Sequence, residues 1–305
     1  MGITLSALKN MQEMGYVESG VKFLDIGSSN LYSAHLKELR EFLSAFKDVR
    51  NLSDEDIERL SKGSLYDPVK GGLNESFVGE LLEWVNIDYQ SFDIADGYKT
   101  KIFDLNKQEI DAEHFEKYDV VANFGTTEHL LNQMNAFGAI HDATKVGGVM
   151  IHEVPACGWI DHGYITYTAR FFYDLATANK YEIDHLAFSG PLPGKKLYDS
   201  VHAFKSYFPS FEKTLKEAPE VLKEMQIPDI SIFICLKKKK SGKFITSLET
   251  STSVGDVYSG GGHGSGVDQV YLSQLQSEVY RLRREMDMIR NVASPLIWLL
   301  RKLRR

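Results

Sequence analysis

Acidic residues and a glycine stand at the ends of several short apolar runs, where their chemistry suits a nucleoside. The first run ends in Asp25-Ile-Gly27, and two later runs end at Asp93 and Asp104. Glycine has no side chain, so the backbone can pass close to a ligand, and an ionised carboxylate accepts hydrogen bonds from ribose hydroxyls. This combination is typical of a site that binds a nucleoside cofactor across the ends of parallel strands.

A second group of residues could accept or donate protons. Glu128 and His129 follow the fourth apolar run, His152 and Glu153 end the fifth, and His162 lies in the loop after it. Imidazole and carboxylate side chains are common general acids and bases. A histidine after a strand is also often a structural residue held by hydrogen bonds, so His129 is a candidate either for catalysis or for shaping a binding pocket.

The loop around His162 is rich in aromatic residues. Trp159, Tyr164 and Tyr167 could stack on a sugar ring, and they could equally pack against the protein. Acidic and histidine side chains are frequent nearby, but no metal-ligand spacing such as H-E-x-x-H occurs. The sequence therefore predicts no metal site, and whether a metal assists is left open.

Alternating strand and helix patterns position these residues. Seven strands are predicted, at 21–26, 89–94, 100–103, 118–123, 148–152, 181–188 and 229–236. Helical patterns occupy 31–47, 54–61, 77–85, 130–144 and 169–179. This alternation predicts an α/β fold with helices on both faces of a mostly parallel sheet, and a ligand at the carboxyl ends of its strands. Residues 31–88 exceed what one crossover helix needs, which indicates an insertion or lid.

The order of the motifs resembles that of class I S-adenosylmethionine-dependent methyltransferases over roughly residues 20–236. Leu24-Asp-Ile-Gly-Ser-Ser-Asn30 is similar to the first motif of that family, although Ser29 and Asn30 stand where further glycines often occur. The resemblance implies a Rossmann-like, seven-stranded sheet that ends in a reversed hairpin, with S-adenosylmethionine as cofactor. The cofactor-binding residues that it implies are Asp25, Gly27, Ser28, Asn30, Asp93, Ile94, Asp104, Leu105, Asn123, Phe124 and Gly125.

The resemblance also implies roles for these positions. Asp93 would bind the ribose, Asp104 the adenine amino group and Leu105 the face of the adenine ring. Asp25 would orient either the loop or the amino-acid end of the cofactor. The stretch 120–129 would wall the methionine and its reactive methyl group. The loop after the fifth strand is where acceptors usually bind in the family. The candidate catalytic residues from these two segments are His129, Glu128 and His162.

The acceptor follows from a narrower resemblance. Residues 161–179 and the C-terminal tail look like those of methyltransferases found with enzymes of bacterial surface-polysaccharide biosynthesis, which implies a sugar, glycan or lipid-linked saccharide acceptor. Methyl transfer is an in-line displacement at an activated carbon, so the protein mainly positions the nucleophile. The alternative is a non-catalytic scaffold with the same fold that oligomerises and recruits glycan-assembly enzymes.

Composition limits the class of protein. The chain of 305 residues is 43% hydrophobic and 25% charged, the balance of an ordinary globular protein. A net charge of -7 argues against nucleic-acid binding, which needs a cationic surface. The two cysteines give no disulfide framework. No apolar run reaches 18 residues and the first 15 residues lack the pattern of a secretion signal, so a cytoplasmic location is expected.

The C-terminal part differs in composition from the rest. Residues 1–240 are predicted to form the methyltransferase domain, 241–266 a glycine-rich flexible linker, and 267–305 a coiled coil with a basic amphipathic tail. The heptad residues, which predict a homo-oligomer, are Leu272, Leu275, Val279, Leu282, Met286 and Ile289. After Pro295, a short apolar stretch stands beside arginine and lysine residues, so the tail could contact the inner face of the membrane or continue the oligomer seam.

Overall fold

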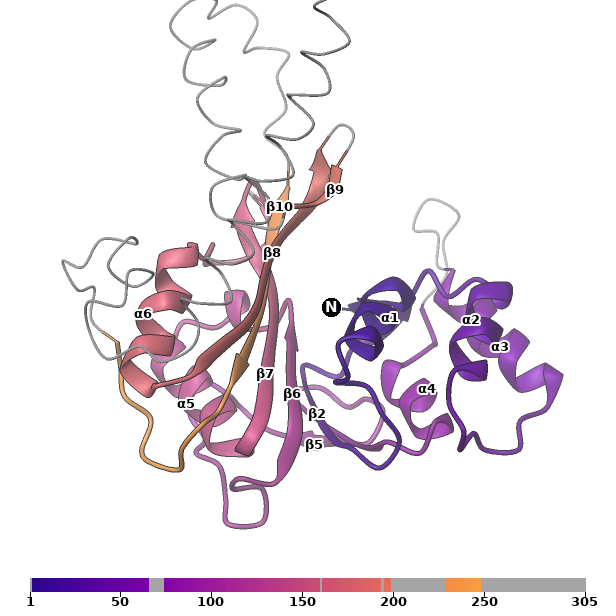
Figure 1. The fold of residues 1–305 in the computed structure, drawn as a ribbon, viewed down its shortest axis with the longest axis horizontal. Helices are drawn as coiled ribbons and strands as arrows, with labels where there is room; N and C mark the ends of the chain where they lie inside the picture. The colour runs from indigo at the N-terminus through magenta and orange to yellow at the C-terminus, as the bar shows by residue number, and fades with distance from the viewer. Residues whose placement is uncertain (1, 66–73, 160, 193–194, 199–228, 248–305) are drawn as a thin grey trace, which may run out of the picture. The chain divides into compact units, whose positions relative to one another are not determined.

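The fold is built on one sheet of eight strands (Figure 1). This computed structural model describes residues 2–65, 74–159, 161–192, 195–198 and 229–247. The strand order is β5-β4-β2-β6-β7-β10-β8-β9. The bounds of these strands, in the same order, are Thr100–Ile102, Asp88–Asp93, Lys22–Ile26, Tyr118–Phe124, Thr144–Cys157, Ile230–Lys237, Glu182–Leu192 and Lys195–Tyr198.

The strand directions match the sheet that the resemblance implied. β2, β4, β5, β6 and β7 pair in parallel, whereas β10 runs antiparallel to both β7 and β8. β10 is the last of these strands in the sequence, yet it lies between β7 and β8, as in a reversed hairpin. All seven predicted strands are present, so the prediction of a Rossmann-like methyltransferase sheet is confirmed, and β9 adds an eighth strand at the edge.

Helices flank the sheet on both sides (Figure 1). α5 (Gln133–Ala143) and α6 (Ala169–Asn179) lie on one side, and α1 (Leu5–Glu13), α2 (Leu36–Ser44), α3 (Asp54–Ser64) and α4 (Val78–Trp84) on the other. Because both faces of the central strands are covered, seven of the eight β10 residues are buried. Continuous burial explains why this central strand reads as an unbroken apolar run rather than as an alternating pattern.

The predicted helix at 31–47 is wrong at its N-terminal end. Residues Asn30–Tyr32 form a strand, β3, that pairs in parallel with β1 (Gly2–Thr4) at the start of the chain. The helix α2 begins only at Leu36. The sequence predicted neither β1 nor α1. For β1 the reason is its length, because a three-residue strand has too short a pattern to be recognised without its partner.

The described part of residues 31–88 is packed into the main core. Side chains from α2, α3 and α4 join side chains of the central strands in one hydrophobic cluster, which includes Leu39, Phe42, Leu60, Leu81, Phe23, Tyr89 and Val120. Residues 66–73 lie outside the described residues. The role of this segment as an insertion or lid stays a prediction.

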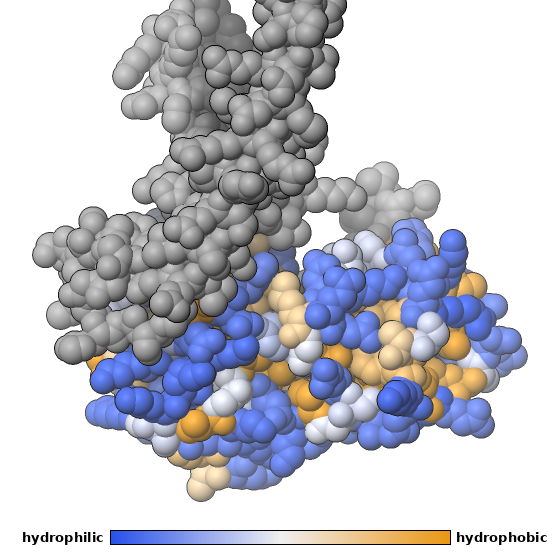
Figure 2. Space-filling view, in the orientation of Figure 1, coloured by the Kyte–Doolittle hydropathy of each residue, from blue (hydrophilic) through white to orange (hydrophobic). Residues whose placement is uncertain are grey.

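On the face shown in Figure 2, the described surface is mostly hydrophilic, with hydrophobic residues in groups between the hydrophilic ones. No helix within the described ranges has the length and apolarity needed to span a bilayer. The predicted coiled coil and basic tail lie outside the described residues. The described chain continues past β10 to residue 247, and the Ile245 backbone amide donates a 2.8 Å hydrogen bond to the side-chain oxygen of Asn179 in α6.

The run of four lysines at the end of β10, residues 237–240, is not uniformly exposed to solvent. Lys238 is fully buried, and its Nζ donates to the carbonyl oxygens of His141 (2.8 Å) and Thr144 (3.0 Å). The same ammonium lies 3.1 Å from a carboxylate oxygen of Glu116. Sequence alone misses this because the neighbouring Lys239 is exposed and forms a 2.7 Å ion pair with Glu182 at the surface.

Replacing Lys238 with methionine is expected to lower the free energy of unfolding by about 3 kcal/mol, because breaking a buried ion pair leaves a charge and two carbonyls unpaired. The matched control, Lys239→Met, removes an exposed pair and should cost less than about 1 kcal/mol. Urea denaturation of both variants measures the difference. Equal stabilities for the two variants would contradict the buried role of Lys238.

Candidate functional site

The loop after β2 has the backbone shape that the Asp-x-Gly motif predicts. Gly27 has a positive φ of 113°, and Ser28 follows at 39°. Asp25 is fully buried and accepts hydrogen bonds from the Ser29 backbone amide (2.7 Å), the Ser29 hydroxyl (3.0 Å) and the Tyr89 hydroxyl (2.8 Å). Burial raises the pKa of Asp25. Its carboxylate therefore orients the loop, which is one of the two roles that the resemblance left open.

The sheet places the end of β4 beside this loop. β2 and β4 pair in parallel with Ile26 opposite Phe92, and the Gly27 amide donates to the Phe92 carbonyl at 2.8 Å. Asp93 is the next residue of β4, so its side chain starts from the same edge of the sheet as Gly27. Ile94 follows and is 73% exposed, an unusual exposure for a large apolar residue.

Asp104 and Leu105 follow β5 at the same edge. The carboxylate of Asp104 accepts from the Asn106 backbone amide at 2.9 Å and pairs with Lys107 at 3.0 Å. The lysine holds the pKa of Asp104 below its usual value. Leu105 is buried. Asp104 thus has protein partners of its own, as a turn residue does, and its place at the strand end remains compatible with the implied contact to adenine.

Two of the implied cofactor residues have mainly structural partners. The Asn30 side chain donates to the carbonyls of Asn74 (3.2 Å) and Ser76 (3.4 Å). Asn123 is fully buried, donates to the Thr127 hydroxyl at 2.9 Å and accepts from the Thr127 amide at 3.2 Å. Asn123 therefore shapes the turn that leads from β6 into the short 3-10 helix η1 (Thr127–His129).

The three predicted catalytic residues come together. Glu128 and His129 lie in η1, and His162 reaches them from the loop after β7. His162 Nε2 lies 3.6 Å from Glu128 Oε1, and the two imidazole centroids are 5.0 Å apart. One ligand atom from each of the three residues lies within 4.8 Å of the others. Gly163 permits this approach, since a Cβ atom there would lie 3.0 Å from Glu128 Cγ.

The carboxyl group of Glu128 is buried, and its basic neighbour among the described residues is the imidazole of His162. Its side chain is 1% exposed, and neither carboxylate oxygen has a hydrogen-bond partner. Burial raises the pKa of Glu128 to about 7 and lowers the pKa of His129. A buried polar group without a partner is costly, so this cluster is a place where a ligand would stabilise the protein.

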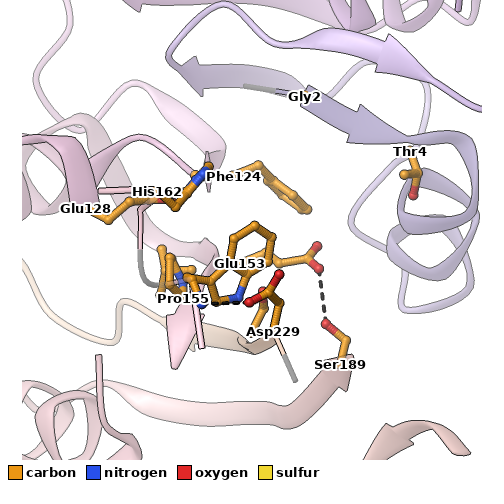
Figure 3. Close-up of a pocket in the computed structure, with 13 residues that line it drawn as sticks. Gly2, Thr4, Phe124, Glu128, Glu153, Pro155, His162, Ser189 and Asp229 are labelled. Atoms are coloured by element: carbon orange, nitrogen blue, oxygen red, sulfur yellow. Dashed lines mark hydrogen bonds and ion pairs between the residues drawn. The ribbon is translucent and has the colours of Figure 1, made fainter. Parts of the chain in front are cut away.

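A cavity of about 410 Å³ opens beside the cluster, at the carboxyl ends of β6 and β7 (Figure 3). Its lining residues are Gly2, Thr4, Phe124, Gly125, Glu128, Glu153, Val154, Pro155, Trp159, His162, Ser189, Asp229 and Ser231. Phe124 and Gly125, both implied as cofactor-binding residues, belong to this wall, whereas Gly27, Asp93 and Asp104 are outside it. The cavity therefore adjoins the part of the implied cofactor site that Phe124 and Gly125 form.

Glu153 is the second carboxylate of the cavity wall. Its carboxylate accepts a 3.3 Å hydrogen bond from the Ser189 hydroxyl of β8, which Figure 3 shows as a dashed line. Burial raises the pKa of Glu153. Asp229, which directly precedes β10, accepts a 2.7 Å hydrogen bond from the Trp159 backbone amide. This bond fixes the start of the aromatic loop.

Other residues that the sequence offered are structural. Successive residues of a strand point to opposite faces, so His152 lies away from the cavity, against Phe137 and Phe172. Burial lowers the pKa of His152 to about 3. Tyr167 is 2% exposed and packs among the same aromatic rings, whereas Tyr164 is 72% exposed.

Several residues of the cavity wall could not be found from the sequence. Gly2 and Thr4 reach the cavity only because β1 pairs with β3, and Ser189, Asp229 and Ser231 reach it through the antiparallel strands. None of them belongs to a motif. The predicted reversed hairpin of the last two strands was the one feature of the sequence that indicated that Ser189, Asp229 and Ser231 lie near the site.

Comparison with known proteins finds similarity in structure alone. No family model matches the chain, and no curated protein sequence does. Similar solved structures include an S-adenosylmethionine-dependent methyltransferase from Mesorhizobium loti, 11% identical over 76% of this chain and 98% of that one, with a TM-score of 0.33. TehB from Haemophilus influenzae is 10% identical over 76% and 62%, with a TM-score of 0.39.

A third similar structure is phosphoethanolamine N-methyltransferase 2 from Haemonchus contortus in complex with S-adenosyl-L-methionine. It is 14% identical over 75% of this chain and 51% of that one, with a TM-score of 0.35. At this low similarity the assignment of the fold depends on the strand order itself. That order, with the antiparallel β10 between β7 and β8, is the one that the resemblance to class I methyltransferases implied.

Proposed function

We propose that the protein is an S-adenosylmethionine-dependent methyltransferase that methylates a hydroxyl group of a sugar or glycan. The observation that carries this proposal is the cavity beside the cofactor edge of the sheet. Its wall holds the carboxylate of Glu128, which has no hydrogen-bond partner among the described residues, and the carboxylate of Glu153. Carboxylates accept hydrogen bonds from hydroxyl groups and attract the positive sulfonium of the cofactor.

The cofactor would lie across the ends of β2, β4 and β5. Gly27 gives close backbone approach, Asp93 accepts the ribose hydroxyls, and Asp104 and Leu105 bind the adenine. Phe124 and Gly125 then lie between the cofactor and the cavity, where the methyl group must be presented. This placement agrees with the rule that ligands of parallel α/β sheets bind outside the carboxyl ends of the strands.

The chemical step is a single displacement. The acceptor oxygen forms a bond to the methyl carbon as the carbon–sulfur bond breaks, and the sulfur keeps the electron pair, giving S-adenosylhomocysteine. The hydroxyl proton passes to Glu153, whose raised pKa makes it a stronger base than an exposed carboxylate. Glu128 and His162, in the same cavity wall, bind other oxygen atoms of the acceptor, and His129 adjoins them in the cluster.

The chemistry of the wall supports a saccharide acceptor. Trp159 presents an aromatic ring that can stack on a sugar, and three acidic side chains can accept hydroxyl hydrogen bonds, namely Glu128, Glu153 and Asp229. A cavity of about 410 Å³ falls within the usual range for small-molecule sites. We therefore propose that one saccharide unit, free or at the end of a glycan or lipid-linked intermediate, enters it.

The assembly and location of the protein remain part of this proposal. The heptad pattern after residue 267 supports a homo-oligomer, and the basic tail supports contact with the inner face of a membrane by a cytoplasmic protein. A role in polysaccharide biosynthesis would bring such a protein close to lipid-linked acceptors.

Calorimetry with S-adenosylmethionine and S-adenosylhomocysteine tests the cofactor, and transfer of labelled methyl groups to nucleotide sugars and glycans tests the acceptor. Binding followed by transfer to a saccharide is the expected result. Absence of binding would favour the non-catalytic scaffold. Binding with transfer only to amine acceptors would retain the methyltransferase and overturn the saccharide assignment.

Replacing Asp93 with alanine is expected to weaken S-adenosylmethionine binding by roughly 10- to 150-fold, because hydrogen bonds to a charged acceptor are worth about 1.5–3 kcal/mol. Asp96→Ala, in the same loop, removes an exposed carboxylate that accepts only from the adjacent Gly97 amide and serves as the control. Calorimetry on both variants gives the two affinities. An Asp93→Ala protein that binds like the control would refute the placement of the ribose.

A further inference from the structure

The cluster of Glu128, His129 and His162 has the composition of a metal site. Two imidazoles and one carboxylate supply three ligand atoms, all within 4.8 Å of one another. They come from two segments that the fold brings together: η1 after β6 and the loop after β7. The spacing of the three residues matches no metal-binding sequence motif, because His162 is separated from the other two residues by α5 and the whole of β7.

A second and independent observation is the state of Glu128. Its side chain is almost completely buried, yet both carboxylate oxygens lack a hydrogen-bond partner. Among the described residues the only basic side chain within ion-pair distance is the imidazole of His162, at 3.6 Å. Buried carboxylates are usually paired with a cation or bound to a metal, because desolvation of an uncompensated charge is expensive.

We propose that Glu128, His129 and His162 bind a divalent transition-metal ion, with Zn²⁺ as the ion that fits the ligands best. Imidazole nitrogen and carboxylate oxygen bind Zn²⁺ at roughly 2.0–2.2 Å, which puts two ligands of a tetrahedral site about 3.4 Å apart. The observed 3.6 Å between His162 and Glu128 is close to this separation. His162 is 40% exposed, so its side chain can rotate to complete the site.

The two imidazoles and one carboxylate of this cluster do not suit Mg²⁺ or Ca²⁺ as the preferred ion. Mg²⁺ and Ca²⁺ favour shells made of oxygen, whereas two imidazoles select zinc and neighbouring transition metals. Three protein ligands leave a tetrahedral ion with one open position. Glu128 and His162 line the cavity, so this position faces it. Use of the open position to bind an acceptor oxygen rests on the proposed function; binding of the ion does not.

Calorimetric titration of the full, metal-stripped chain with Zn²⁺ tests the site, and the visible absorption of added Co²⁺ reports the nitrogen ligands and the coordination geometry. Loss of a residue that only hydrogen-bonds to a metal ligand weakens metal binding by roughly 10- to 100-fold. Glu128→Gln and His162→Gln each remove a ligand itself, so each is expected to weaken zinc binding by more than this. Asp161→Asn removes an exposed carboxylate next to His162, and His35→Gln removes an exposed imidazole just before α2; both variants should bind zinc as the unaltered chain does.

Circular dichroism of each variant establishes that the fold is retained. The proposal is overturned if the unaltered chain binds no zinc, or if the two cluster variants bind zinc and cobalt as well as the two controls do. Magnesium should not displace the cobalt absorption, and displacement at equal concentration would also overturn the choice of ion. Because these measurements need neither cofactor nor acceptor, failure of the metal site is distinguishable from failure of the methyltransferase assignment.

Discussion

Replacing Gly27 with valine is expected to abolish measurable binding of S-adenosylmethionine. Gly27 has a φ of 113°, a conformation that a β-branched residue does not readily adopt. The valine side chain would also occupy the space through which the cofactor must pass at the end of β2. Calorimetry with S-adenosylmethionine measures the loss directly.

A matched control separates the loss of the site from backbone strain. Gly20 precedes β2, has a φ of 87°, and a Cβ atom there would meet no atom within 4 Å. Gly20→Val therefore introduces strain of about 1–3 kcal/mol without approaching the cofactor edge. The Gly20 variant should be destabilised but still bind the cofactor. If Gly27→Val binds as tightly as Gly20→Val, the assignment of the first motif is wrong.

The strands were predictable because burial on both faces leaves a simple signature. β6 and β10 lie inside the sheet and read as continuous apolar runs, and their ends were placed within one residue. β1 and β3 were missed because each has three residues, and only their pairing in space makes them strands. Their absence from the prediction also extended the expected helix at 31–47 too far toward the N-terminus.

The candidate catalytic residues were predictable for a geometric reason. The carboxyl ends of neighbouring parallel strands meet at one edge, so Glu128 after β6 and His162 after β7 had to lie close together. The face that a side chain occupies was harder to predict. His152 and Glu153 are adjacent in sequence, yet His152 is buried among aromatic rings of α5 and α6 while Glu153 lines the cavity.

Burial of a charge is the feature that composition predicts least well. Lys237 and Lys239 form surface ion pairs, whereas Lys238 between them is fully buried. A run of four lysines gives no hint of this difference, because the partners of Lys238 are backbone carbonyls at the end of α5 and a carboxylate before β6. The burial of the Glu128 carboxyl group at the candidate site is likewise not predictable from composition.

Replacing Glu153 with glutamine is expected to lower the rate of methyl transfer by roughly 100- to 10,000-fold, the contribution of a positioned general base. Glutamine keeps the size of the side chain and can still contact Ser189, so the cavity should persist. The affinity for S-adenosylmethionine should change much less than the rate. Steady-state kinetics together with calorimetry on the same variant separate these two effects.

The pH dependence distinguishes a base from a residue that only binds the acceptor. A base acts when it is ionised, so the rate of methyl transfer by the unaltered protein should rise with pH as Glu153 loses its proton. This rise should occur above the usual pH range of glutamate, because burial raises the pKa of Glu153. Glu153→Gln should lack this rising limb, and Glu153→Asp should restore it at a reduced rate. A Glu153→Gln enzyme whose rate still rises over the same pH interval would show that another group takes the proton, while an unchanged rate at saturating substrate would remove Glu153 from the mechanism altogether.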